Sequence, residues 1–156
     1  MKLRNINNKG NAAIEFAIIL PLFLFICLGI IEFSVLLYDK AMITNASREG
    51  ARKGILFVDI DLVDPVVDIE SVVSNTVNKY LQNWLISFGS SSTATVETNP
   101  DYDIPGSSDK GVKVTVRYNY NFLVLPNLSS FFGSGFTDTQ TLEAITVMRK
   151  EDQSES

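Results

Sequence analysis

The run of residues between Glu15 and Glu32 contains no charged side chain, and it constrains the fold more than any other part of the 156-residue chain. Apolar character continues beyond Glu32, so residues 12–38 supply more than the roughly 20 residues that a membrane-spanning helix needs. The hydrophobic region of a cleaved secretory signal is shorter, about 7–15 residues, and ends at a small-x-small site. Here the best downstream match is weak and lies beyond the charged pair Asp39-Lys40. The sequence therefore predicts a retained single-pass anchor.

The amino-acid composition argues against several classes of function. The sequence has no histidine and one cysteine, Cys27, so it contains no Ser-His-Asp triad, no Cys-His pair, no zinc site of the usual ligand types and no intrachain disulfide. Cys27 lies inside the apolar run, where it is expected to act as a small hydrophobic residue. The formal net charge of -5 argues against nucleic-acid binding, which requires a basic face. We therefore expect a chain that is not an enzyme, has no metal or cofactor and binds no nucleic acid.

A single carboxylate marks the start of the apolar run. Glu15 follows Gly10 by five residues, and the flank before Gly10 carries three basic residues, Lys2, Arg4 and Lys9. A charged side chain at the centre of a membrane helix costs about 2.5–3.5 kcal/mol on insertion scales, so an acidic residue there indicates a function. Glycine lets another molecule approach the backbone closely, because it has no side chain. The alternative is an edge glutamate that extends to the lipid headgroups.

This arrangement resembles the class III signal of type IV pilin-like proteins, in which a prepilin peptidase cuts after a small residue and a glutamate follows at the fifth position of the mature chain. Together with Glu15-Phe16, residues 47–52 and 142–151 are similar to the TadE-like family, the minor pseudopilins of tight-adherence (Flp) pilus systems. The resemblance implies cleavage between Gly10 and Asn11, and roles for Glu15 and Phe16 in processing and assembly. Phe16 and the large C-terminal region favour a pseudopilin over the major pilin, which is shorter and often has tyrosine after the glutamate.

The resemblance also implies partners and a location. The partners are a prepilin peptidase, other pseudopilins, the major Flp pilin, the inner-membrane assembly platform with its ATPase, and membrane lipid. Because the peptidase cuts on the cytoplasmic face, the N-terminus would be cytoplasmic and the C-terminal domain extracytoplasmic, in the inner membrane or in the pilus. Basic residues flank both ends of the apolar run, so the positive-inside rule does not decide the orientation. The alternative is a single-pass anchored binding module, an adhesin or a sensor, that is not processed.

Two further features lie on the expected N-terminal helix. Pro21 removes a backbone donor, which predicts a kink or local unwinding at residues 17–21; the alternative is simple tolerance of proline in a membrane helix. In pilin-like proteins, a proline here is associated with helix bending in the filament. Beyond the span, Arg48, Glu49 and Arg52 predict either a solvated helix turn or a docking surface for another subunit. Docking would suit the neighbouring small residues, which allow close backbone approach: Ala46, Gly50, Ala51 and Gly54.

The remaining sequence predicts a helix. Asp64-Pro65 is a start signal, apolar residues recur at helical spacing from Val66 to Phe88, and Gly89 is a stop signal. We expect this amphipathic helix to pack on a sheet. A ligand-binding or membrane-surface role for Trp84 is the alternative to packing.

The sheet is predicted from alternation. Residues 112–122 alternate apolar and polar side chains, as in a strand with one buried face. Residues 93–98 and 139–149 are expected to be its partners, with a loop over residues 99–111 and a connection over residues 123–136. Asp101, Asp103 and Asp109 could ligate calcium, but the EF-hand spacing is missing, which favours a solvated acidic loop.

The predicted fold class is therefore α+β. It consists of a long N-terminal pilin-like transmembrane helix, an amphipathic helix and a small antiparallel β-sheet. The expected divisions are a cleaved leader over residues 1–10, a transmembrane and assembly helix with a stalk over residues 11–57, an extracytoplasmic α+β domain over residues 58–150 and an acidic tail over residues 151–156.

Overall fold

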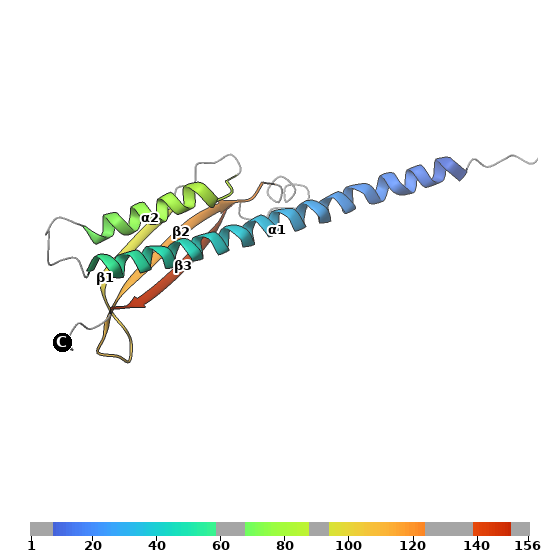
Figure 1. The fold of residues 1–156 in the computed structure, drawn as a ribbon. Coiled ribbons are helices and arrows are strands. Elements are labelled where there is room, and N and C mark those ends of the chain that lie inside the picture. The colour runs from blue at the N-terminus through green and yellow to red at the C-terminus, as the bar shows by residue number, and fades with distance from the viewer. Residues whose placement is uncertain (1–7, 59–67, 88–93, 124–138, 151–156) are drawn as a thin grey trace, which may run out of the picture.

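The computed structural model describes residues 8–58, 68–87, 94–123 and 139–150, which form two helices and a three-stranded sheet (Figure 1). The predicted α+β class is confirmed, with a long apolar N-terminal helix, a second helix and a small antiparallel sheet. In chain order, the elements are α1 (Asn8–Val58), α2 (Ile69–Trp84), β1 (Thr95–Asp103), β2 (Lys110–Asn121) and β3 (Thr139–Arg149).

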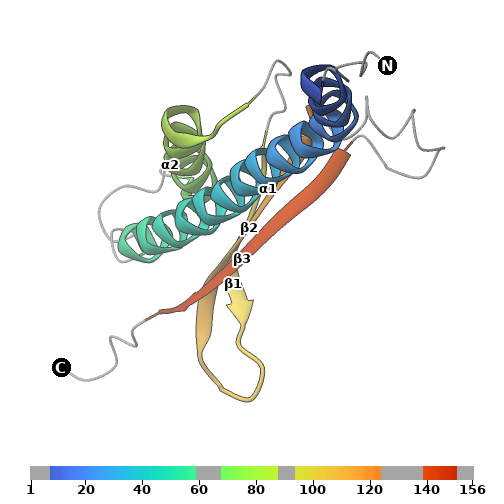
Figure 2. The same cartoon turned by 90° about the vertical axis from the view of Figure 1, so that its right-hand side faces the viewer.

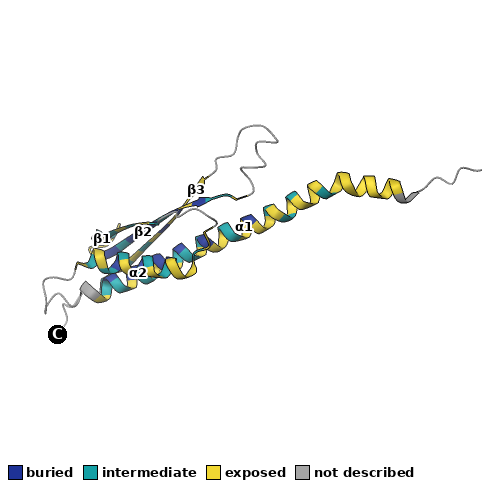
Figure 3. Cartoon of the chain, turned by 90° about the horizontal axis from the view of Figure 1, so that it is seen from above, coloured by how far each residue is buried: buried dark blue, intermediate teal, exposed yellow. Residues whose placement is uncertain are grey.

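Helix α1 has 51 residues and passes through two different environments. Over residues 10–31 nearly all side chains are exposed, and this half projects away from the rest of the chain (Figures 1 and 3). From Glu32 onward, α1 buries one face against α2, β2 and β3. The expected stalk is thus a core element of the domain, rather than a spacer between the domain and the anchor.

The helix runs through Pro21 without a break. Proline is tolerated in long apolar helices where local adjustments satisfy the freed backbone carbonyl. The local unwinding that we expected at residues 17–21 is not observed. Bending of the helix at Pro21 in an assembled filament stays a prediction.

Helix α2 begins later than its predicted start. Asp68 caps its N-terminus, because the Asp68 carboxylate accepts a hydrogen bond of 3.1 Å from the backbone N–H of Glu70. The predicted start signal Asp64-Pro65 and the predicted stop Gly89 both lie outside the described residues, and α2 ends at Trp84.

The amphipathic character of α2 is confirmed, with one exception. Val73, Val77 and Leu81 recur every four residues and are buried, which is the spacing of one helix face. Trp84 continues the apolar pattern in the sequence, but the structure leaves it exposed. The packing face of α2 therefore ends one turn before Trp84.

The sheet has the order β1-β2-β3, and both pairings are antiparallel. The predicted central strand and the predicted third strand are confirmed as β2 and β3. The predicted loop over residues 99–111 is wrong over most of its length, since β1 continues to Asp103 and β2 begins at Lys110. A bulge between Asn99 and Tyr102 places Pro100, which has no N–H, where pairing is interrupted on an edge strand.

A tight turn closes this hairpin. The backbone N–H of Ser107 donates to the carbonyl of Ile104 at 3.1 Å, with Pro105 and Gly106 between them. Gly106 has a φ of +83°, a conformation that a type II turn requires at its third position and that glycine adopts without strain. Pro-Gly at these two positions explains why the chain reverses here rather than earlier.

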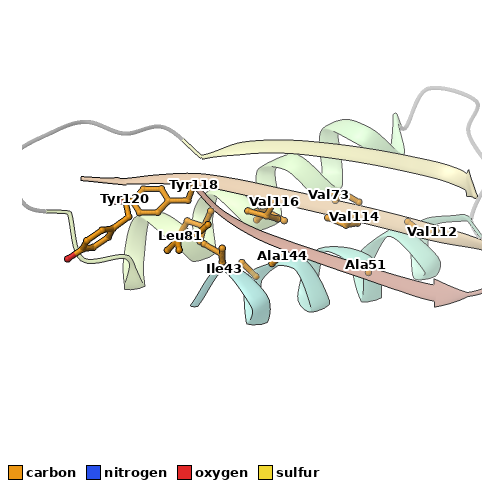
Figure 4. Close-up of a cluster of buried hydrophobic side chains, with 13 residues drawn as sticks. Ile43, Ala51, Val73, Leu81, Val112, Val114, Val116, Tyr118, Tyr120 and Ala144 are labelled. Carbon is orange, nitrogen blue, oxygen red and sulfur yellow. The ribbon is translucent and has the colours of Figure 1, made fainter. Parts of the chain in front are cut away.

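Both helices cover the same face of the sheet (Figure 2). The hydrophobic core lies between the helices and the sheet and follows β2, as Figure 4 shows. Every second residue of β2 belongs to this core, and the residues between them point to the other face of the sheet. The core residues of β2 are Val112, Val114, Val116, Tyr118 and Tyr120. Alternate residues of a strand point to opposite faces, so one strand supplies both surfaces.

The small residues of α1 belong to this core, which corrects their expected role in subunit docking. Ala46, Gly50, Ala51 and Gly54 are buried. A Cβ at Gly50 would lie 2.7 Å from a methyl carbon of Val77, and one at Gly54 would lie 3.0 Å from a methyl carbon of Val112. Small side chains let α1 approach α2 and β2 closely, so they serve packing within the chain.

Candidate functional site

The exposed half of α1 has the length and composition of a single-pass membrane anchor. The 22 residues from 10 to 31 extend about 33 Å at 1.5 Å per residue, against a hydrocarbon thickness of about 30 Å. Large apolar side chains on all sides of this segment are open to solvent, including Ile14, Phe16, Ile18 and Phe23. A helix that is apolar all round requires a membrane or other apolar helices around it.

The predicted processing residues all lie in the first turns of this exposed segment. Gly10, Asn11, Glu15 and Phe16 are helical and exposed. A Cβ at Gly10 would meet nothing within 4 Å outside the backbone of its own helix, so no other described element packs against this position. Asn11 and Glu15 are four residues apart, about 6 Å along the axis, and they share one helix face.

Glu15 is the only charged residue among residues 10–31. Its carboxylate forms no ion pair with any side chain that the structure describes. A charge in an apolar environment is costly unless an opposite charge compensates it. The arrangement therefore leaves Glu15 available to a cation from outside the described residues.

The structure brings the three predicted docking residues together. Arg52 donates to Glu49 through two nitrogens, at 2.9 and 3.0 Å, and this pair shares a shallow surface hollow with Arg48. Tyr80 of α2 and Met148 of β3 also line the hollow. Most of this charged surface faces solvent, on the side of α1 that the core leaves free. Its use for docking stays a prediction.

Two acidic residues of α1 that the sequence analysis did not single out are buried where the domain begins. Glu32 lies next to the sheet: its carboxylate accepts a hydrogen bond from the backbone N–H of Leu123, and its carbonyl accepts one from the Tyr120 hydroxyl at 3.5 Å. Asp39 accepts a hydrogen bond of 3.1 Å from the backbone N–H of Ile86. The second oxygen of Asp39 has no hydrogen-bond partner among the residues that the structure describes.

A signal for this pair was present in the sequence. Glu32 and Asp39 are seven residues apart, two helical turns, so they lie on the same face of α1. From the sequence, Glu32 served only as the limit of the uncharged run and Asp39 only as part of a charged pair beyond the expected span. Their spacing equally fits the edge of a packed domain, and the structure favours that interpretation.

Tyr120 is the sheet residue that meets this acidic face. Burial, together with the negative charges of Glu32 and Asp39, raises the pKa of Tyr120 to about 12. The phenol therefore stays neutral and can donate to the Glu32 carbonyl. This hydrogen bond holds the C-terminal end of β2 against α1 at Glu32, where the buried part of the helix begins.

The acidic residues at the other end of the sheet are largely paired. Lys150 donates to Asp101 at 2.7 Å, and this hydrogen bond lowers the pKa of the Asp101 carboxyl. Arg149 forms an ion pair with Asp109 at 3.1 Å. Within the described ranges, no group of three or more histidine, cysteine, aspartate or glutamate residues is placed to hold a metal ion. These contacts give Asp101 and Asp109 a role in closing the end of the sheet.

Comparison with known proteins bears on the N-terminal helix. Residues 10–52 match the model of the family described as TadE-like protein. This segment is TadE-like. The match begins at Gly10 and covers the exposed apolar segment, the buried acidic pair and the charged cluster that ends at Arg52. The family resemblance expected from the sequence is thereby confirmed for residues 10–52, and the expected similarity of residues 142–151 lies outside the match.

No curated protein and no solved structure matches the chain significantly. The family match covers α1 and leaves out α2 and the sheet. A TadE-like helix that is long and apolar enough to cross a membrane fits a membrane protein of a Tad system.

Proposed function

We propose that the chain is a membrane-anchored minor pseudopilin, cut by a prepilin peptidase between Gly10 and Asn11, that acts in assembling or priming a tight-adherence pilus. Its N-terminus is cytoplasmic and its α+β domain extracytoplasmic. Its partners are the peptidase, other pseudopilins, the major Flp pilin and the inner-membrane assembly platform. The chain acts as a subunit that the ATPase-driven platform assembles, rather than as an enzyme.

The observation that carries the proposal is the position of Glu15. It is the one charge among residues 10–31, its side chain is exposed, and it follows the proposed Gly10–Asn11 cleavage site by one helical turn. Cleavage would create an α-amine on Asn11 at the membrane boundary. That amine and the Glu15 carboxylate attract each other more strongly in a low dielectric than in water.

This attraction supplies a recruitment and register mechanism. A subunit whose Glu15 has no counter-charge is destabilised in lipid, whereas one that docks beside a processed neighbour gains a cationic partner. The apolar residues around Glu15 provide the remaining contact surface between neighbouring helices. The length of α1 supports the same function, since one continuous helix links this surface to the domain.

The intact mass of the full chain, extracted from membranes with and without a co-expressed prepilin peptidase, tests the proposal. We expect a peptidase-dependent loss of residues 1–10. The Gly10→Lys variant is the matched control and should remain uncut under both conditions. An uncut wild-type chain in the presence of active peptidase would refute processing and favour the unprocessed binding module.

A further inference from the structure

We infer that the anchor-proximal end of the domain is a lipid-binding surface that seats the domain on the bilayer, with Trp84 in the headgroup layer. The surface consists of Trp84, Ile86 and Leu123, and we call it the basal surface. This inference goes beyond the proposed function, because it holds whether or not the N-terminus is cleaved.

The first step is the position of these residues relative to the anchor. The backbone N–H of Leu123 is bonded to the carboxylate of Glu32, the first buried residue of α1. The backbone N–H of Ile86 is bonded to Asp39, two turns further along. Both basal segments are thus attached to the two turns of α1 that directly follow its exposed half, and Figure 1 shows α2 ending on this side of the domain.

The second step is exposure. Trp84 has a relative exposure of 56%, Leu123 of 52% and Ile86 of 38%. Tryptophan and tyrosine are enriched at membrane–water interfaces, because the ring is apolar and the N–H or O–H group can remain hydrated. A large, exposed tryptophan beside a membrane-spanning helix therefore fits a lipid interface.

The third step is the course of the apolar surface along α1. Phe33 and Leu37 are 60% and 52% exposed, although Glu32 and Asp39 in the same two turns are buried in the domain. The apolar surface therefore continues past residue 31, along the side of α1 that the domain does not cover. Residues 12–38 extend about 40 Å, close to the thickness of a bilayer with its headgroup regions, about 40–45 Å. The basal segments are bonded to Glu32 and Asp39, in the same two turns of α1 as Phe33 and Leu37. A bilayer that covers Phe33 and Leu37 therefore also reaches the basal surface.

The fourth step is the distribution of charge. No charged residue occurs in residues 80–96 or in residues 118–137, the two stretches that include the basal segments. Asp101, Asp103 and Lys110 lie at the opposite end of the sheet, and the charged strand residues nearest the basal end, Glu97, Arg117 and Glu143, form ion pairs with one another. Removing charged groups from water is costly, whereas uncharged polar and apolar groups enter the interface readily. The lack of charge in the basal stretches therefore favours lipid over an acidic or basic protein partner.

Trp84 is the only tryptophan in the chain, so its fluorescence reports on the basal surface without labelling. The full-length protein would be reconstituted into phosphatidylcholine–phosphatidylglycerol vesicles whose acyl chains carry bromine at defined depths. We expect blue-shifted emission and quenching that is strongest for bromines nearest the headgroups. We also expect less quenching by aqueous acrylamide in vesicles than in detergent.

A matched control moves the reporter to the other end of the domain. The double variant Trp84→Phe, Leu56→Trp places a tryptophan at an exposed position near the end of α1. This variant should be quenched by acrylamide and not by brominated lipid. Equal lipid quenching at both positions would overturn the inference, because the whole domain would then lie flat on the membrane.

Three results for wild type would also overturn it. The first is Trp84 emission that brominated lipids leave unchanged and acrylamide quenches freely. The second is blue-shifted emission that neither agent quenches, which would indicate a protein neighbour at the basal surface. The third is quenching that is strongest for bromines at the acyl ends, which would place Trp84 in the bilayer centre.

Discussion

Asp39 of α1 accepts a hydrogen bond of 3.1 Å from the backbone N–H of Ile86, although 47 residues separate them in the chain. The contact joins the end of α2 to the helix that continues into the anchor. Asp39 is fully buried, and within the described part of the chain its second carboxylate oxygen has no hydrogen-bond partner. The domain thus keeps a costly buried acid at the point where its two helices meet, close to the exposed half of α1.

Asp39→Ala should destabilise the domain by about 1–3 kcal/mol, because it removes the charged acceptor of the part-buried hydrogen bond from the backbone N–H of Ile86. Asp39→Asn is the matched control, since its amide oxygen can still accept that hydrogen bond while the buried charge is removed. We expect Asp39→Asn to unfold close to the wild-type temperature or above it. Circular dichroism melts of the full chain in detergent would measure both. Equal losses in the two variants would show that the negative charge, rather than the acceptor, is required.

Gly50→Ala should lower the unfolding temperature, even though alanine is intrinsically favoured over glycine in a helix by about 1 kcal/mol. The added methyl group would lie 2.7 Å from Val77, and overpacking of this kind costs about 1–3 kcal/mol. Gly29→Ala provides the control, because nothing lies within 4 Å of a Cβ at that position. The unfolding temperatures of the two variants should therefore shift in opposite directions from wild type, or differ clearly from each other. A stabilised Gly50→Ala variant would mean that α1 and α2 are not closely packed.

The sequence was sufficient to predict an element where its residue pattern fits only one kind of secondary structure. Alternation over residues 112–122 predicted β2, and the third strand was predicted with the bounds that the structure gives it. The apolar run predicted a helix because no other open structure satisfies its backbone in lipid. The predicted loop at residues 99–111 failed because its proline and aspartates are typical of turns, whereas a bulge at an edge strand accommodates them.

The division of α1 could not be obtained from the sequence. Glu32, Asp39 and Gly50 each have an explanation in a membrane or docking helix when taken alone. Only the positions of Leu123, Ile86 and Val77, which are distant in the chain, show that they belong to a packed core. Tertiary contacts of this kind decide where an anchor ends and a domain begins.

The stability of the domain should fall as the pH rises from about 10 to about 12. Burial and the nearby acidic side chains raise the pKa of Tyr120 to about 12 in the folded state, above the value of 10 for an ordinary tyrosine. The unfolded chain therefore loses this proton first, and alkaline pH favours unfolding. Below pH 10 the phenol is neutral in both states and the contribution is complete. Urea titrations at a series of pH values would measure this dependence.

Tyr120→Phe removes the ionising group and keeps the ring. This variant should lose part of the alkaline destabilisation, and it should be somewhat less stable at neutral pH because the Glu32 carbonyl loses a donor. The free energy of unfolding of wild type and variant should therefore converge as the pH approaches 12. Parallel curves over this range would contradict the assignment of the shift to Tyr120.

Glu15→Ala should abolish pilus assembly while the protein remains anchored in the membrane. Removing the only charge among residues 10–31 makes insertion more favourable, so membrane fractionation should show an undiminished level of protein. The same change removes the carboxylate that would pair with the α-amine of a processed neighbour. Cross-linking to other pilus subunits should therefore fall, and so should the number of pili seen by electron microscopy. Glu70→Gln, at an exposed position in the first turn of α2, removes one negative charge from the domain and should leave assembly intact. Normal piliation with Glu15→Ala would reduce Glu15 to an edge residue that extends to the headgroups, and the attraction between carboxylate and amine would then have no part in assembly.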